Sequence, residues 1–320
     1  MGRYLDPKYD LPFKLIFGEH KNLCISLINS MLPFDENRRV ETIEYETSEL
    51  VPEIRNLKHS IVDVRCTDNY SRQFIVEMQM NWTESFKSRV LLNASKAYIR
   101  KLDASQDYRL LYPVYSINFV NDVFEKSPEM RDEYYHHYQI VNVRHTEKRI
   151  EGLELVFIEL PKFKPHTRAT RKLHELWLRF LTEINESTEE APAELLSDEN
   201  VREAVHYTEA GAYSKGQLLA YDRMKMAVVD ERSLLSGWRE EGMNAGREIG
   251  REIGREEGRA EGREEGREEG REEGREEGRA EVAVHALKKG MSPEDVSEFT
   301  GLPLNEIRKL KDGLSGFARH

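Results

Sequence analysis

The sequence has few cysteines and no long apolar run. It contains two cysteines in 320 residues, Cys24 and Cys66, which are far apart and lack metal-ligand spacing, so neither a disulfide framework nor a zinc site is expected. No window approaches about 18 uninterrupted apolar residues, and the charged start lacks the apolar core of a secretory signal. We therefore expect no membrane partner and a reducing cytoplasmic location.

The chain also lacks an excess of positive charge. Its formal net charge is −11, which argues against a uniformly basic nucleic-acid-binding surface but leaves room for a local basic cleft. Apolar residues make up 38% and charged residues 33% of the chain, so one buried core and an extended or solvated part are expected. The length fits about two domains.

Residues 1–165 have the pattern of a mixed α/β domain. Asp10 stands before Pro12 as a helix N-cap would, with proline in the first turn. Apolar periodicity and strand composition predict helices at 12–17, 22–31 and 84–102, and strands at 60–66, 73–80, 114–120, 138–143 and 155–160. This order of strands and helices predicts a mixed sheet with helices packed on it.

The remainder of the chain divides by composition into three parts. Residues 166–236 are expected to form a helical extension, and residues 237–281 contain a glycine at every fourth position from Gly242 to Gly278. Residues 282–320 return to ordinary composition, with a Ser292-Pro293 helix start and a Thr300-Gly301 turn. This last segment resembles the helix-turn-helix of site-specific recombinases; the alternatives are DNA docking and a small helical or dimerisation cap.

The glycine repeat is regular but carries no chemistry of its own. Between Arg247 and Glu281 it holds nine arginines and fourteen glutamates. Ten glycines cost a helix about 10 kcal/mol relative to alanine, whereas the Glu–Arg pairs return roughly 2–4 kcal/mol. A solvated, partly helical spacer is therefore favoured over a helix stabilised in a homo-oligomer. Direct DNA contact is disfavoured because phosphate binding needs net positive charge.

The informative stretch is Ile61–Met80, "IVDVRCTDNYSRQFIVEMQM". Glu77 and Gln79 alternate with apolar neighbours and share one face of the second strand. If the loop comprises residues 68–72, antiparallel pairing places Asp63 directly opposite Glu77, with Cβ atoms about 4.5–5.5 Å apart. Opposed carboxylates need a shared proton, a cation or a metal, and carboxylates with waters are typical Mg²⁺ ligands.

A different interpretation of the same pattern is a surface ion-pair cluster. Arg65 shares a face with Asp63 and lies diagonal to Glu77 in this register. A register slip of one residue would place the two acids on opposite faces. The pattern alone therefore leaves both interpretations open.

These residues resemble the PD-(D/E)XK nuclease superfamily, and in detail its recombination-promoting nuclease, or transposase-like, branch. The matching stretches are "YDLPFKLIFG", "IVDVRCTDNYSRQFIVEMQM", "SRVLLNASKAYIRKL", "YPVYSINFV" and "LVFIELPKF". They cover residues 5–165. The resemblance implies a restriction-endonuclease-like mixed β-sheet core flanked by helices, followed by helical segments and a long repeat helix or spacer.

The resemblance also implies a Mg²⁺-dependent DNA endonuclease, with Mn²⁺ or Ca²⁺ as ions that could replace Mg²⁺ in vitro. Asp63 matches the motif aspartate and Glu77 the acid of the (D/E)XK part, so both are expected to ligate the metal. Gln79 stands where the superfamily usually has lysine, and we expect it to help position the attacking water. Asp10 and Lys14 are accessory candidates, against the simpler alternatives of a helix cap and a solvated lysine.

The hypothesis is thus a DNA endonuclease of the recombination or transposase type. The alternative is a DNA-binding or oligomeric assembly protein with a nuclease fold and little or no cleavage, which the glutamine at position 79 favours.

Overall fold

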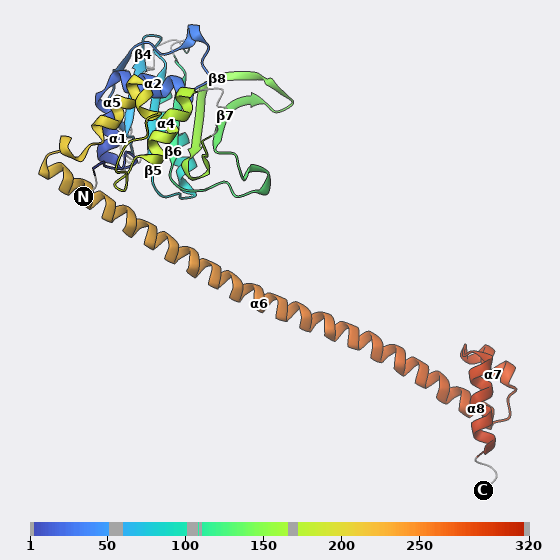
Figure 1. Ribbon diagram of the computed structural model, residues 1–320. Helices are drawn as coiled ribbons and strands as arrows, with labels where there is room; N and C mark the ends of the chain where they lie inside the picture. The colour runs from blue at the N-terminus through green and yellow to red at the C-terminus, as the bar shows by residue number, and fades with distance from the viewer. Residues whose placement is uncertain (1–2, 51–59, 101–107, 109–110, 166–171, 317–320) are drawn as a thin grey trace. The chain divides into compact units, whose positions relative to one another are not determined.

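The computed structural model describes residues 3–50, 60–100, 108, 111–165 and 172–316 (Figure 1). They form two compact units, residues 1–235 and 236–320. The first unit is built on a six-stranded mixed sheet of order β1-β4-β5-β6-β8-β7. Its strands are β1 (Ile43–Tyr45), β4 (Val64–Asp68), β5 (Gln73–Gln79), β6 (Val114–Val120), β7 (Tyr135–Asn142) and β8 (His145–Glu159); β2 (Glu49–Leu50) and β3 (Ser60–Ile61) pair separately.

Helices cover both faces of this sheet because its central strands are apolar on both sides. α1 (Asp10–Glu19), α2 (Lys21–Met31), α4 (Lys172–Glu183) and α5 (Glu199–Tyr207) contribute to one large core with the sheet (Figure 1). α3 (Ser85–Ile99) packs on the opposite face through smaller clusters. β5 and β6 are parallel, and α3 is the crossover helix that a parallel connection requires.

The hairpin that carries the predicted acids has the expected register. β4 and β5 are antiparallel, and Val64 pairs with Val76, so the next positions along the two strands are Asp63 and Glu77. The connection between β4 and β5 comprises residues 69–72. The first predicted strand is interrupted, however, because residues 62 and 63 leave the ladder between β3 and β4.

Other elements match the predictions with shifted ends. β6 has the predicted bounds, whereas β8 begins ten residues before the predicted 155. The predicted helix at 84–102 is α3, and residues 101 and 102 lie outside the described part of the chain. Asp10 is the first residue of α1 rather than its cap: Tyr9 is the N-cap, and no side chain caps this helix.

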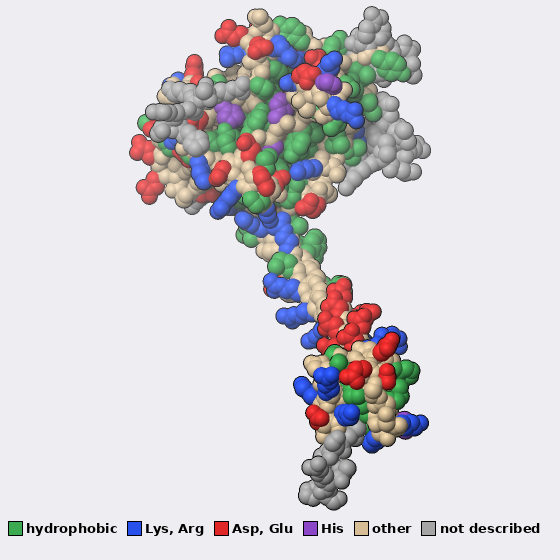
Figure 2. Space-filling view, turned by 90° about the vertical axis from the view of Figure 1, so that its right-hand side faces the viewer, with side chains coloured by type: hydrophobic (Ala, Val, Ile, Leu, Met, Phe, Trp, Pro, Cys, Tyr) green, Lys and Arg blue, Asp and Glu red, His purple; other side chains and the backbone are tan. Residues whose placement is uncertain are grey.

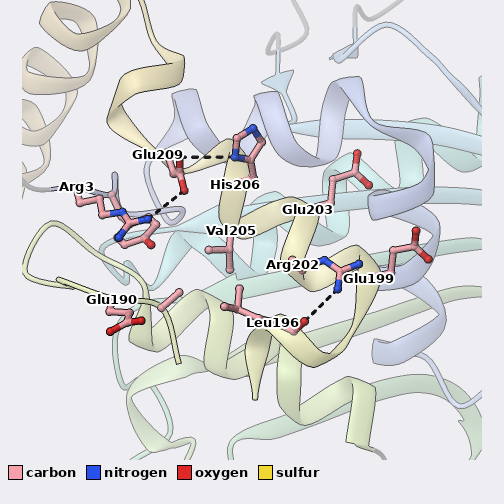
Figure 3. A pocket seen from close by; sticks show the side chains of 11 residues that line it. Arg3, Glu190, Leu196, Glu199, Arg202, Glu203, Val205, His206 and Glu209 are labelled. Atoms are coloured by element: carbon pink, nitrogen blue, oxygen red, sulfur yellow. Dashed lines mark hydrogen bonds and ion pairs between the residues drawn. The ribbon is translucent and has the colours of Figure 1, made fainter. Parts of the chain in front are cut away.

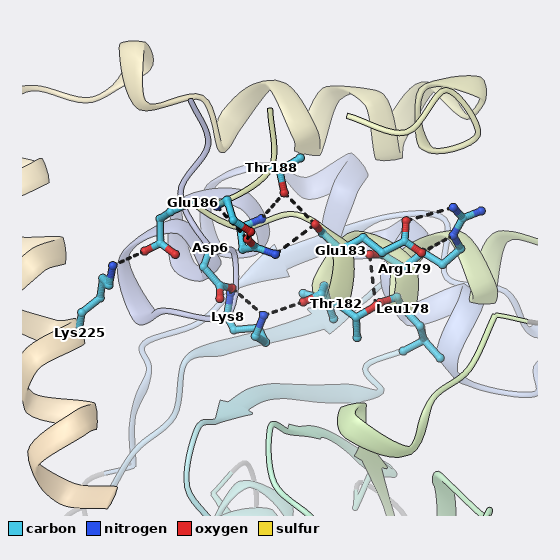
Figure 4. Close-up of polar contacts among 12 residues, drawn as sticks. Asp6, Lys8, Leu178, Arg179, Thr182, Glu183, Glu186, Thr188 and Lys225 are labelled. Atoms are coloured by element: carbon cyan, nitrogen blue, oxygen red, sulfur yellow. Dashed lines mark hydrogen bonds and ion pairs between the residues drawn. The ribbon is translucent and has the colours of Figure 1, made fainter. Parts of the chain in front are cut away.

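A set of polar contacts joins the start of α6 (Lys215–Lys288) to the sheet-bearing unit (Figure 4). The Tyr221 hydroxyl donates to Glu186 Oε1 (2.6 Å) and accepts from the Asp6 backbone N–H (2.9 Å). Lys225 Nζ lies 2.5 Å from the same Glu186 carboxylate. Buried Lys8 binds Asp6 Oδ1 (2.9 Å) and the carbonyl of Leu181 (3.1 Å). The first turns of α6 are therefore part of the first unit.

α6 continues as one helix through the whole repeat segment. The segment is thus helical throughout rather than partly helical, and it is solvent-exposed as a spacer would be. Stabilisation of this helix in a homo-oligomer stays a prediction. Backbone hydrogen bonds of a helix do not depend on side chains, so a glycine-containing sequence can form them at a cost in stability. A Cβ added at any of the ten glycines from Gly242 to Gly278 would meet nothing within 4 Å.

The second unit ends in α7 (Pro293–Thr300) and α8 (Leu304–Gly316). Ser292 caps α7 by accepting from the Asp295 N–H (3.2 Å), and Gly301 ends it with a φ of 70°. The buried residues Ala283, Val296 and Ile307 join α6, α7 and α8. Arg308, one of the basic residues of α8, lies 3.2 Å from Glu294.

Basic and acidic side chains are interspersed over the first unit on the face shown in Figure 2. This distribution agrees with the net charge of −11, and any attraction for a polyanion on this face must be local. None of the helices in the described ranges is apolar over a length that could cross a bilayer.

Candidate functional site

Asp63 and Glu77 come together where β4 begins and β5 ends. Asp63 has left the strand ladder, and its Oδ2 accepts a hydrogen bond from the backbone N–H of Met78 in β5 (2.8 Å). This bond fixes the Asp63 carboxylate beside the β5 segment that carries Glu77. Only 5% of Glu77 is exposed, because α3 covers this face of the sheet. The two acids therefore share a largely desolvated site.

Burial and a neighbouring carboxylate make each of the two acids hard to ionise. Burial raises the pKa of Asp63 to about 6, and the neighbouring Asp10 carboxylate adds to the rise, against the Met78 N–H and Lys14. Burial and then the charge of Asp63 raise the pKa of Glu77 to about 7, against Asn93 and Arg89. Near neutral pH the site thus has more negative charge than its surroundings compensate, which favours binding of a cation.

Asp10 and Lys14 lie at the same site, one turn apart on α1. Lys14 Nζ is 2.5 Å from Asp10 Oδ1 and 3.7 Å from Asp63 Oδ1. Burial opposes the charge of Lys14, but the hydrogen bonds and charges of Asp10 and Asp63 outweigh it and raise the lysine pKa. The alternatives of a plain helix cap and a freely solvated lysine are therefore wrong, because both side chains pair within this cluster.

The surface ion-pair interpretation is also wrong, because Arg65 is not at the surface. It is 2% exposed, and its guanidinium binds Glu46 Oε2 and Gln73 Oε1 at distances of 2.7 and 2.8 Å. Its charge is therefore engaged by Glu46, which directly follows β1, and the pairing of Asp63 with Glu77 is not a solvated cluster.

Helix α3 supplies two polar side chains that complete the site. Asn93 Nδ2 donates to Glu77 Oε1 (3.1 Å), and the Arg89 guanidinium donates to Gln79 Oε1 (2.5 Å). Residues four apart on a helix are about 6 Å apart along its axis, which matches two residues of a strand. An antiparallel helix can therefore address both strand residues at once. Gln79 Nε2 donates to the Asn81 carbonyl (2.7 Å), so its amide orientation is fixed at both ends.

The donor set fits a hard divalent cation. Asp63 and Glu77 offer carboxylate oxygens, which are the ligands that Mg²⁺ prefers, and a cation would relieve the repulsion by Asp63 that contributes to the raised pKa of Glu77. Within the described ranges no group of three or more His, Cys, Asp or Glu side chains is arranged to hold a metal. Waters and phosphate oxygens would thus have to complete the coordination, as is usual for Mg²⁺.

A second buried acid, Glu159, shows what a structural carboxylate looks like in this fold. It is fully buried, and it lies 2.8 Å from His136 Nε2 and 2.6 Å from Lys162 Nζ. It also accepts from the backbone N–H groups of Phe124 (2.6 Å) and Glu125 (3.1 Å). These partners already compensate the charge of Glu159 and fill its hydrogen-bonding positions, whereas Asp63 and Glu77 repel each other.

A surface pocket beside α5 does not coincide with the acid cluster (Figure 3). Its basic residues have partners of their own: Arg3 and His206 both lie 3.7 Å from Glu209, and Arg202 donates to the Leu196 carbonyl (3.4 Å). The carboxylates of Glu190, Glu199 and Glu203 line the same pocket. This mixture offers neither a site for an anion nor a reactive group, so the acid cluster remains the candidate site.

A mixed six-stranded sheet with helices on both faces, and an Asp…Glu-x-Gln cluster on its antiparallel hairpin, defines a restriction-endonuclease-like fold. The chain belongs to the PD-(D/E)XK nuclease family transposases, because the model of that family matches residues 7–237. The family resemblance predicted from the sequence is thus confirmed. Neither a curated protein nor a solved structure matches the chain.

Sequence reasoning missed Arg89 and Asn93 as members of the cluster. One signal was present: Asn93 lies on the stripe of α3 that contains Val90, Ala94 and Ala97, all of which are buried. An amide among buried apolar residues needs a partner. Nothing in the sequence pattern, however, indicates that this partner is Glu77.

Proposed function

We propose that this protein is a Mg²⁺-dependent DNA endonuclease of the recombination or transposase type that acts in the cytoplasm. The observation that carries the proposal is the pair of desolvated acids, Asp63 and Glu77, whose pKa values are raised to about 6 and 7. Such perturbed acids at one site are a feature of functional centres. Family membership supplies the reaction class, nuclease action on DNA.

In this proposal each side chain has a separate task. Asp63 and Glu77 hold the cation, with the Met78 N–H and Asn93 fixing their orientation. Gln79 Oε1 has a second lone pair beside its bond to Arg89 and accepts a hydrogen bond from the attacking water. Lys14 balances the charge of Asp10 and Asp63. When bound, the divalent cation supplies Lewis-acid polarisation of the phosphate and activation of water.

The core at residues 1–165 would perform this reaction. We assign the helical extension (166–236), the repeat segment (237–281) and the C-terminal helices (282–320) to accessory roles. A lysine in place of Gln79 would add a positive charge that an amide cannot supply, so activity lower than that of lysine-containing relatives is expected.

The test is nicking and linearisation of supercoiled plasmid with Mg²⁺, Mn²⁺ or EDTA. Asp63→Asn keeps an oxygen acceptor for the Met78 N–H and removes the charge, so metal-dependent cutting should disappear in a folded protein. Asp35→Asn is the matched control, because Asp35 is exposed and caps nothing. Cutting that survives in Asp63→Asn would place the activity elsewhere or in a contaminant.

Self-assembly with little or no cleavage is the second candidate, favoured by one observation. Apolar side chains remain more than half exposed along α6, including Met243 and Ile249 in the repeat segment. Packing against a second copy of the helix would bury them. Light scattering, which measures the molar mass in solution, tests this role. The chain lacking residues 242–320 should form assemblies of fewer subunits than the full chain. An unchanged number of subunits would exclude assembly through the tail.

A further inference from the structure

Arg89 differs from the other cation of the site in what it binds. Lys14 is neutralised by Asp10 and Asp63. The only side-chain hydrogen bond of Arg89 in the described part of the chain goes to the neutral amide of Gln79, and no described carboxylate lies within ion-pair distance of it. Its charge is therefore uncompensated by direct contact at the mouth of an acidic site.

The Arg89 guanidinium is also held in place. Its Cζ lies 4.8 Å from the ring centroid of Phe86, which is itself 1% exposed and anchored in the core beneath α3. The Gln79 carbonyl fixes the guanidinium from the strand side, and the Asn81 carbonyl fixes the Gln79 amide in turn. A guanidinium has five N–H donors, so most of them remain for another acceptor.

Exposure decides which acceptor this is. Arg89 is solvent-exposed although Phe86 beneath it is buried, so a ligand can reach it without any rearrangement of the helix. Planar guanidinium groups bind phosphate oxygens through two parallel hydrogen bonds. The adjacent acids exclude a carboxylate ligand unless a cation is bound with it, whereas a phosphodiester can bridge a cation and a guanidinium.

We propose that Arg89 binds the phosphodiester of the DNA at this site and supplies from α3 the positive charge that position 79 lacks. Gln79 and Phe86 act as positioning residues for this guanidinium. The inference rests on the proposed nuclease function, because it assigns the phosphate-binding group of the same site.

The experiment compares Arg89→Ala, Arg89→Gln and Arg89→Lys with Lys96→Ala, which removes one positive charge from the last turn of the same helix. Single-turnover plasmid cutting should fall about 10²–10³-fold in Arg89→Ala and Arg89→Gln, the usual loss for one charge-stabilising donor. Arg89→Lys should recover part of the rate, and Lys96→Ala should stay within about twofold of wild type. Cutting by Arg89→Gln within twofold of wild type would overturn the assignment.

A binding measurement separates this inference from the proposed function. Affinity for a fluorescent DNA duplex, measured against salt with Ca²⁺ present, should show a salt slope reduced by about 1 in Arg89→Ala and Arg89→Gln and nearly restored in Arg89→Lys. If wild type binds but does not cut, the nuclease proposal fails and this slope still tests Arg89. An unchanged slope in both neutral variants, with unchanged thermal stability, would show that Arg89 does not contact phosphate.

Discussion

Replacing Glu77 with glutamine should stabilise the metal-free protein while removing its response to metal. The pKa of Glu77 rises from its ordinary value of 4.5 to about 7 on folding. Each tenfold change in proton affinity corresponds to about 1.4 kcal/mol, so the ionised side chain costs the folded state about 3 kcal/mol. The contribution of the protonated Glu77 side chain to folding stability is fully present below pH 4.5 and is lost as the pH rises through about 7. A glutamine keeps the shape, accepts the Asn93 bond and cannot ionise.

The assay is urea unfolding of wild type and Glu77→Gln in EDTA between pH 4.5 and 8. The stability difference should grow in favour of the variant by about 3 kcal/mol over this range, which corresponds to about 6–12 °C in Tm for a unit of this size. Adding Mg²⁺ should stabilise wild type alone, by about 2.7 kcal/mol at a hundredfold excess over Kd.

Glu41→Gln, at an exposed position, is the control and should follow wild type at every pH. Parallel pH profiles for wild type and Glu77→Gln would refute the reasoning, since they would show that Glu77 ionises in the fold at no cost. In Asp63→Asn the advantage of adding Glu77→Gln should shrink, because the charge of Asp63 contributes to the raised pKa.

Three further predictions concern the rest of the molecule. Lys162→Met should destabilise the first unit by about 3–5 kcal/mol in urea unfolding, because it leaves Glu159 buried without its ammonium partner. The control, Lys164→Met, breaks only an exposed pair with Asp132 and should cost less than about 1 kcal/mol. Equal losses of stability in the two variants would contradict this prediction. Tyr221→Phe keeps the ring but strands the Asp6 N–H, so a loss of about 1–3 kcal/mol is expected by the same method. Alanine at three repeat glycines, 258, 262 and 266, should raise the helical circular dichroism signal and the melting temperature of the tail, because each substitution stabilises the helix by up to about 1 kcal/mol. A decrease in the melting temperature would reveal a partner packed on the glycine row.

The sequence predicted the central strands best because their physical signal is strongest. β6 is buried at every position, and its mainly apolar sequence leaves little ambiguity in its ends. The outer part of β8 escaped prediction because residues 145–151 are exposed and, except for Ile150, polar. The segment therefore lacks the alternation of apolar and polar residues that indicates a strand. Asp63 interrupts its predicted strand because its carboxylate, rather than its backbone, binds β5.

The candidate site was predictable only where its residues share one hairpin. The opposition of Asp63 and Glu77 follows from strand pairing and loop length. The contributions of α1 and α3 depend on how helices dock on the sheet, which local pattern does not encode. Cys24 and Cys66 illustrate the same limit: they are distant in sequence, yet both are buried and the Cys24 thiol contributes to the raised pKa of Cys66.

The contacts of Asn81 limit where the chain can be shortened. Its side-chain amide donates to the Val228 carbonyl (3.2 Å) and to Glu231 Oε2 (2.8 Å), both in α6, while its own carbonyl holds the Gln79 amide. A chain that stops before α6 therefore loses a support of the candidate site together with the helix, and its inactivity would say nothing about the tail. A chain that ends at residue 241 keeps every one of these bonds.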